Sequence, residues 1–182
     1  MPNNVKKYIF ISLTLGVIAA SGALLIAGTN LITKDRIAAN ENNSINSGIK
    51  NIFNNENAFA KEKNKIEGNA YDYVTVRYSI YENDETPIGY AFRTDGSNNY
   101  GKISLIIGFN KDFVYKGLSI IANEQSFAST LKKGYLDVIK GGQKTVDEVD
   151  VSCGATYGAK LVKEMVKEAG KAAKDLAGVN NG

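Results

Sequence analysis

Residues 150–158, DVSCGATYG, contain the side chains best suited to chemistry, and they directly precede a run with helical periodicity. Ser152 or Cys153 stands near the position of a helix N-cap, and Gly154 allows the backbone to come close to a ligand. The first amides of a helix have no intrahelical partner and lie at the positive end of its dipole. A hydroxyl at Thr156 therefore predicts a phosphate site, with the phosphate either hydrogen-bonded or esterified to the threonine. Simple capping of the helix is the alternative that these residues leave open.

The residue types that the chain lacks exclude most other reactive sites. There is no histidine, and Cys153 is the only cysteine. The sequence therefore excludes histidine-ligated haem, a catalytic triad or Cys-His pair, a four-thiolate iron–sulfur or zinc site, and an internal disulfide. The acidic residues show no EF-hand spacing, and we expect no metal site. Any redox chemistry would require an organic cofactor.

Composition and charge indicate one compact domain with a short appendage. The chain has 182 residues, of which 43% are hydrophobic and 23% are charged, as is ordinary for a single core. The formal net charge is only +3, and the lysines are scattered along the chain. A nucleic-acid surface carries a basic stripe interleaved with aromatic residues, so we expect no nucleic-acid partner.

Residues 8–32 contain no Asp, Glu, Lys or Arg and have charged residues on both sides. At about 1.5 Å per residue, a helix of this length spans a hydrocarbon core of roughly 30 Å. We therefore predict a transmembrane anchor over residues 8–33. A cleaved signal peptide is the alternative, although its apolar region covers only about 7 to 15 residues. Lysines on the short tail, residues 1–7, favour a cytoplasmic N-terminus and an extracytoplasmic remainder.

Residues 34–69 are predicted to connect this anchor to the folded domain. Isoleucines recur at helical spacing among polar residues, which indicates a juxtamembrane amphipathic helix; they are Ile37, Ile45, Ile49 and Ile52. Residues 54–69 are rich in Asn, Lys and Glu and show no periodicity, so we expect them to form a loop.

Residues 70–182 are predicted to form an α+β domain, in which helices flank an antiparallel sheet. Apolar and polar residues alternate over 71–81 and again over 88–92, which indicates a hairpin with its turn at residues 83–85. We expect two further strands at 103–109 and 113–122, a polar loop at 94–101, a helix at 127–139, and a long amphipathic helix starting near Ala155.

Residues 150–157, Asp-Val-Ser-Cys-Gly-Ala-Thr-Tyr, resemble the Asp-x-x-(Ser/Thr)-Gly-Ala-Thr flavinylation motif of the FMN-binding domain family. That family includes the G-type subunit of the Rnf ion-translocating electron transport complex and a related subunit of the sodium-translocating NADH:quinone oxidoreductase. The order of parts is also similar. An N-terminal anchor is followed by a Thr-Lys-Asp-Arg-Ile-Ala-x-Asn segment at residues 33–40, a sheet, the motif and a terminal helix.

This resemblance implies that a phosphoester joins FMN to Thr156. In the family, a dedicated flavin transferase uses FAD as the donor and acts outside the cytoplasm. Asp150, Gly154 and Ala155 occupy matching positions of the motif, whereas Cys153 stands where the family has Ser or Thr.

A second departure follows the motif, because Gly158 and Ala159 stand where many members have Thr or Ser followed by Ser. Both departures would alter how the transferase recognises the motif and which hydrogen bonds form around the phosphate.

The positions of other residues suggest further contacts to the cofactor. Tyr100 with Gly101 matches the family's aromatic-glycine turn and is a candidate for contact with the flavin ring, as is Tyr157 beside the acceptor. Lys160, one helical turn beyond the acceptor, could pair with the phosphate. Glu124 matches the acidic residue of a Glu-Thr-Pro-Gly-like loop. For each of these side chains, an ordinary packed or solvated role is the alternative.

The resemblance implies an electron-transfer subunit of an Rnf-like, ion-translocating oxidoreductase. Such a subunit would pass the cytoplasmic (inner) membrane once, hold its C-terminal domain outside the cytoplasm, and contact other subunits of the complex. It would have no substrate-turnover site of its own. Two alternatives remain: a stand-alone extracytoplasmic flavin reductase or electron carrier, and a non-redox, membrane-anchored interaction domain in which Gly-Ala-Thr only starts a helix.

Overall fold

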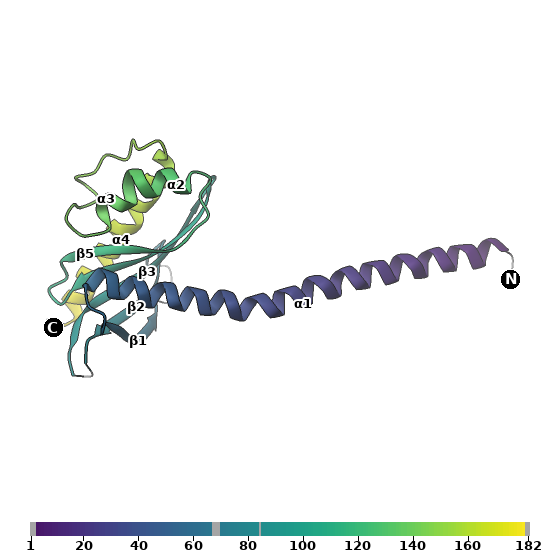
Figure 1. The fold of residues 1–182 in the computed structure, drawn as a ribbon, viewed down its shortest axis with the longest axis horizontal. Helices are drawn as coiled ribbons and strands as arrows, with labels where there is room; N and C mark the ends of the chain where they lie inside the picture. The colour runs from purple at the N-terminus through teal and green to yellow at the C-terminus, as the bar shows by residue number, and fades with distance from the viewer. Residues whose placement is uncertain (1–2, 67–69, 84, 181–182) are drawn as a thin grey trace. The chain divides into compact units, whose positions relative to one another are not determined.

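The computed structural model describes residues 3–66, 70–83 and 85–180 (Figure 1). The chain forms two compact units, Met1–Asn40 and Glu41–Gly182, which we call the anchor unit and the sheet unit. Helix α1 (Asn3–Phe53) contributes to both units. The amphipathic helix expected after the anchor is therefore the C-terminal part of one continuous helix.

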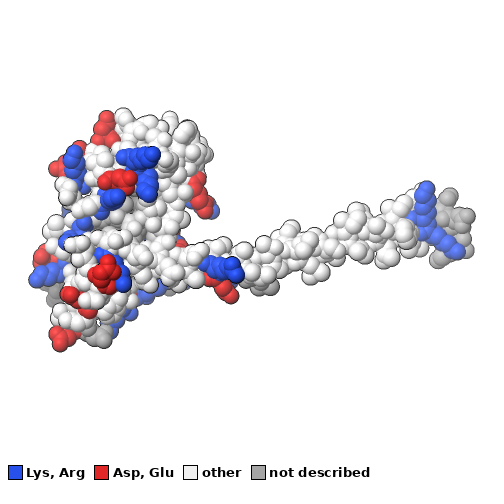
Figure 2. Space-filling view, in the orientation of Figure 1, with Lys and Arg blue, Asp and Glu red and all other residues white. Residues whose placement is uncertain are grey.

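The anchor unit consists of the first part of α1, where large apolar side chains are exposed. Leu13 is 65% exposed and Leu25 is 73% exposed. The hydroxyls of Thr14 and Ser21 donate to carbonyls one turn earlier, at 2.9 and 2.8 Å, and so are satisfied within the helix. Figure 2 shows a long stretch of this unit without charged side chains. By length and composition α1 could cross a membrane, where lipid would cover the apolar side chains.

Five strands form one antiparallel sheet, in the order in which they follow along the chain. Each strand pairs with its neighbour in sequence, so the sheet is a meander. The strands are β1 (Phe59–Lys65), β2 (Val74–Tyr81), β3 (Pro87–Asn98), β4 (Gly101–Asn110) and β5 (Tyr115–Asn123). The α+β fold with an antiparallel sheet, predicted from the alternating pattern, is confirmed.

Strand β1 corrects the prediction of a loop over residues 54–69. It lies at an edge of the sheet, and most of its side chains are exposed. Charged side chains on an edge strand oppose pairing with another chain, but they also remove the alternation by which a strand is recognised. Residues 67–69 of the predicted loop, and residue 84 of the predicted hairpin turn, lie outside the described residues.

The prediction of a polar loop over residues 94–101 was also wrong, because β3 continues to Asn98 and β4 begins at Gly101. The two strands pair up to the connection at residues 99–100. Hydrogen bonds hold the polar residues in the sheet. The Asp95 carboxylate, for example, accepts bonds from hydroxyls on both neighbouring strands, at 2.8 and 2.6 Å.

Helices cover both faces of the sheet (Figure 1). On one face lie α4 (Thr156–Asn180) and a shorter helical segment made of α2 (Ala128–Leu131), the π-helical turn η1 (Lys132–Leu136) and α3 (Asp137–Ile139). On the other face, Ile45, Ile49 and Ile52 of α1 pack against side chains of β2, β3 and β4. The helices predicted at 127–139 and from Ala155 onward are confirmed.

Ion pairs connect α1 with the sheet, and we call the three residues Glu41, Arg93 and Asp95 the ionic cluster. Arg93 in β3 forms ion pairs with the carboxylates of Glu41 in α1 and Asp95. Burial alone would raise the pKa of Asp95, but hydrogen bonds from Arg93 and from two hydroxyls outweigh it and lower that pKa. Asp95 is therefore ionised at neutral pH.

Candidate functional site

Thr156 is the first residue of α4, and it is half-buried. The amide of Ala159 donates to the carbonyl of the buried Ala155 at 3.0 Å, which is the first bond of the helical ladder. The amides of residues 156–158 therefore have no intrahelical acceptor and lie at the positive end of the helix dipole. This arrangement is suited to a negatively charged group attached to the Thr156 hydroxyl.

The loop before α4 holds its shape by local hydrogen bonds. The Asp150 side chain is exposed, and its Oδ1 accepts a bond from the Ser152 amide at 3.0 Å. The Cys153 amide donates to the Val151 carbonyl at 2.8 Å. Gly154 follows with a φ of +80°, a conformation that favours glycine. The chain thus turns sharply into the first turn of α4.

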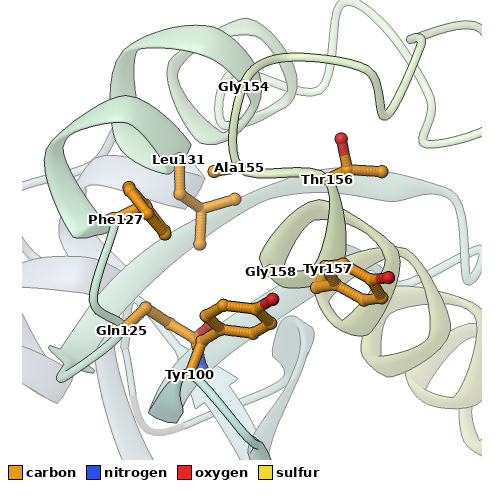
Figure 3. Close-up of a pocket in the computed structure, with 9 residues that line it drawn as sticks. All are labelled: Tyr100, Gln125, Phe127, Leu131, Gly154, Ala155, Thr156, Tyr157 and Gly158. Atoms are coloured by element: carbon orange, nitrogen blue, oxygen red, sulfur yellow. The ribbon is translucent and has the colours of Figure 1, made fainter.

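A cavity of about 240 Å³ opens beside this turn (Figure 3). It lies where the β3–β4 connection, the segment after β5, α2 and the start of α4 meet. Its lining residues are Tyr100, Gln125, Phe127, Leu131, Gly154, Ala155, Thr156, Tyr157 and Gly158. Three parts of the chain that are distant in sequence, around residues 100, 125–131 and 154–158, therefore build one site.

Three aromatic rings form an exposed wall at the cavity. The rings of Tyr100 and Tyr157 are stacked, with centroids 5.3 Å apart and planes inclined by 22°. The ring of Phe127 lies 6.2 Å from that of Tyr100. Asn98 Nδ2 donates to the Tyr157 carbonyl at 3.2 Å, which joins the end of β3 to α4. Figure 3 shows the Thr156 hydroxyl pointing away from the two tyrosine rings.

Residues 6–52 match the family model described as the RnfG N-terminal region. The match covers about a quarter of the chain, so this similarity is one of the N-terminal region. The match ends one residue before the end of α1, so the sheet, the cavity and Thr156 lie beyond it. No curated protein matches the chain. The matched region contains the apolar helix that could cross a membrane, and its similarity is to the N-terminal region of a subunit of an Rnf complex.

Five of the residues predicted for the cofactor site line the cavity: Tyr100, Gly154, Ala155, Thr156 and Tyr157. They come from the β3–β4 connection and from the start of α4. The structure thus brings the aromatic-glycine turn next to the threonine, although more than fifty residues separate them in sequence.

Cys153 is half-buried and packs against η1 instead of lining the cavity. A Cβ atom at Gly134 in η1 would lie 2.8 Å from the Cβ of Cys153. Residue 134 therefore has no room for a side chain, and a glycine there lets η1 approach Cys153 closely.

The remaining predicted residues lie near the cavity without lining it. Gly101 has a φ of +127°, and a Cβ there would lie 2.2 Å from the Glu124 carbonyl oxygen, so this glycine serves the pairing of β4 with the segment after β5. The Glu124 side chain is exposed. Lys160 is exposed as well and forms no ion pair with any described residue. Asp150 supports the loop instead.

Four lining residues were not predicted: Gln125, Phe127, Leu131 and Gly158. Gln125 is only 6% exposed, and its Nε2 donates to the Gly101 carbonyl at 2.5 Å. A polar residue directly after a strand was the available signal, but the motif resemblance pointed to its exposed neighbour Glu124. Gly158 stood out only as a departure from the motif. Its Cβ would lie 2.9 Å from Leu131 Cδ2, so glycine lets α4 approach α2.

Tyr135 in η1 is fully buried in the core and stays neutral. Burial, followed by the charges of Asp147 and Cys153, raises the pKa of Tyr135 to about 12. Its hydroxyl is 3.4 Å from the Val146 carbonyl, to which it donates.

Among the described residues no group of three His, Cys, Asp or Glu side chains could hold a metal ion. The chemistry that the site itself offers is therefore an esterifiable hydroxyl beside an aromatic cavity.

Proposed function

We propose that this chain is the FMN-carrying electron-transfer subunit of an Rnf-like, ion-translocating oxidoreductase, with FMN joined to Thr156 by a phosphoester. The RnfG-type N-terminal region supports membership of the complex. The observation that carries the cofactor assignment is the position of Thr156, at the start of α4 and on the wall of an aromatic cavity.

Attachment exchanges one phosphate bond for another. A bond forms between Thr156 Oγ and the FMN phosphorus, and the pyrophosphate P–O bond of FAD breaks. AMP leaves, and the threonine proton is released. A flavin transferase supplies FAD and catalyses the exchange. The free amides of residues 156–158 then stabilise the phosphate oxygens through hydrogen bonds and the helix dipole.

The cavity fits part of an FMN molecule. Its volume of about 240 Å³ is below the roughly 300–1,000 Å³ of pockets that enclose whole ligands. Its wall offers aromatic rings for the flavin face and a few polar atoms for the flavin edge. FMN supplies a centre that accepts electrons and passes them on. A partly exposed ring suits a carrier, because other cofactors of the complex must come within transfer distance.

Covalent attachment fits a site outside the cytoplasm. A free cofactor would be lost there by dilution, whereas a tether keeps its local concentration high. Lys6 and Lys7 before the apolar part of α1 favour a cytoplasmic N-terminus, and this orientation exposes the sheet unit on the other side. Other subunits of the complex would then meet the aromatic wall at the cavity mouth.

The test is the mass of the full chain after co-expression with a flavin transferase in an exporting host. We expect the wild type to gain one FMN less one water and to fluoresce in a denaturing gel, and Thr156→Val to show neither signal. Thr130→Val is the matched control, because Thr130 is an exposed hydroxyl residue whose Cγ2 lies near Gly154. It should be modified like the wild type. An unmodified wild-type chain would contradict the proposal and favour a non-redox interaction domain.

A further inference from the structure

Gln125 is a buried polar side chain on an otherwise largely apolar part of the cavity wall. It is 6% exposed, and Leu131 and Phe127 line the cavity beside it. Figure 3 shows it across the cavity from Thr156. Burying an amide among apolar groups costs free energy unless its hydrogen bonds are made. A polar atom of Gln125 that faces the cavity therefore needs a partner, which is water or a ligand that displaces it.

One half of the amide has its partner. Nε2 donates to the Gly101 carbonyl at 2.5 Å, and this bond fixes which atom of the amide is the donor. Oε1 then lies on the side of α4, where a Cβ built on Gly158 would be 3.3 Å from it. No hydrogen bond from any other described residue reaches Oε1. The amide thus presents an unused acceptor at a cavity that Gly158 also lines.

We propose that Gln125 Oε1 accepts a hydrogen bond from the N3–H group of the flavin ring and so turns the pyrimidine edge of the ring into the cavity. The inference rests on the proposed function, because it assumes that FMN is attached at Thr156. N3–H is the only N–H donor of an oxidised flavin ring, and it lies at the edge opposite the dimethylbenzene ring. Docking of N3 at Gln125 leaves the dimethylbenzene edge facing out of the cavity.

This orientation determines which part of the cofactor a partner can reach. The rings of Tyr157 and Phe127 are 63% and 53% exposed, so the mouth of the cavity is open on the aromatic side. The exposed dimethylbenzene edge would lie there and shorten the path to a neighbouring redox centre. Gln125 would then hold the ring in place without taking part in electron transfer.

The experiment combines a change in the protein with a change in the cofactor. Full-length wild type, Gln125→Met and Gln125→Glu are loaded by a flavin transferase with either FAD or N3-methyl FAD. Glu124→Gln is the matched control, because Glu124 is the exposed neighbour that does not line the cavity. Intact mass reports attachment, and iodide quenching of flavin fluorescence reports how much of the ring is undocked.

For the wild type, we expect N3 methylation to increase iodide quenching about fivefold, as the loss of one buried hydrogen bond predicts. Gln125→Met with ordinary FMN should show the same increase, and methylation should add nothing further. Gln125→Glu keeps an acceptor and should stay close to the wild type at low pH, where the carboxyl can also donate to the Gly101 carbonyl. Glu124→Gln should match the wild type with both cofactors.

Equal quenching of the two cofactors in the wild type would overturn the inference. This comparison uses only the wild-type chain, so it does not depend on whether a variant folds. In a further experiment, the wild-type chain is loaded from an FAD that lacks one ribityl hydroxyl. If that change, and not N3 methylation, increases quenching, Gln125 binds the ribityl chain and the inference is wrong. A wild-type chain without added mass would instead overturn the proposed function, so the two failures can be told apart.

Discussion

The space around Thr156 determines which side chains its neighbours can have. A Cβ at Gly158 would lie 2.9 Å from Leu131 Cδ2, and Leu131 is fully buried. Position 134 in η1 is restricted in a similar way, because a Cβ there would lie 2.8 Å from the Cβ of Cys153. The departure at position 158 thus has a packing reason in this chain, whereas nothing in the structure explains the cysteine at position 153. A Ser or Thr at position 158, as in many members of the family that the motif resembles, would require Leu131 to shift or to be smaller.

Two glycine substitutions in α4 should therefore have opposite effects. Gly158→Ala forces a methyl group against Leu131, and we expect it to lower the free energy of unfolding by about 1–3 kcal/mol. Gly170→Ala meets no atom within 4 Å and should raise that free energy by about 0.5–1 kcal/mol, because alanine favours the helix. Urea unfolding of the two variants measures both effects. If the two variants are equally stable, α2 and Leu131 can move away from the new methyl group without lowering the free energy of unfolding.

The sheet unit depends on contacts between elements, and those of α1 combine apolar and ionic groups. Ile45, Ile49 and Ile52 cover one face of the sheet, while Glu41 pairs with Arg93. The ionic cluster sits next to this apolar interface, where water screens it less than at an open surface. We expect it to determine how the sheet unit responds to acid.

The response to acid follows from the pKa of Asp95, which lies below its ordinary value of 3.8 in the folded protein. The folded state then binds the proton less readily than the unfolded state. The stability that the ionised carboxylate contributes is present above about pH 4 and is lost as the pH falls through the lower folded pKa.

Asp95→Asn tests this contribution, because it removes the charge and keeps the size of the side chain. We expect it to lower the free energy of unfolding at pH 7 by about 1–3 kcal/mol, since Arg93 loses a charged partner. It should also weaken the acid dependence below about pH 4. Urea unfolding across this pH range measures both, with the exposed Asp112→Asn as control. An unchanged acid dependence in Asp95→Asn would contradict the assignment.

As a whole, the molecule is divided within α1. The described apolar side chains of the anchor unit are exposed, whereas those of the last turns of α1 belong to a core of the sheet unit. One helix therefore has two parts: a first part whose exposed apolar side chains could face lipid, and a last part that packs in a protein interior.

Two truncations test this division. Residues 41–182 keep Ile45, Ile49 and Ile52, and we expect this fragment to be soluble and folded. Residues 54–182 lose all three, and burying each such side chain contributes about 1.5–3 kcal/mol. That loss is comparable to the roughly 5–15 kcal/mol by which a typical domain is stable, so the shorter fragment should not fold. Circular dichroism and gel filtration distinguish the outcomes. A folded 54–182 fragment would show that α1 is dispensable for the sheet.

The sequence alone determined the features that arise from local patterns. The charge-free run of residues 8–32 predicted the apolar helix, alternation predicted the antiparallel strands from β2 to β5, and the apolar stripe predicted α4. Thr156 at a helix start could be found in the same way, because capping and dipole effects depend on adjacent residues.

Only the tertiary structure decided which distant residues meet at Thr156. Gln125, Phe127 and Leu131 line the cavity because α2 packs across the start of α4, and no local pattern encodes that contact. β1 and the end of β3 were missed for a related reason, since polar strands are held by hydrogen bonds to partners far away in sequence. Local periodicity fixes the elements, whereas burial of their apolar faces against one another fixes the site.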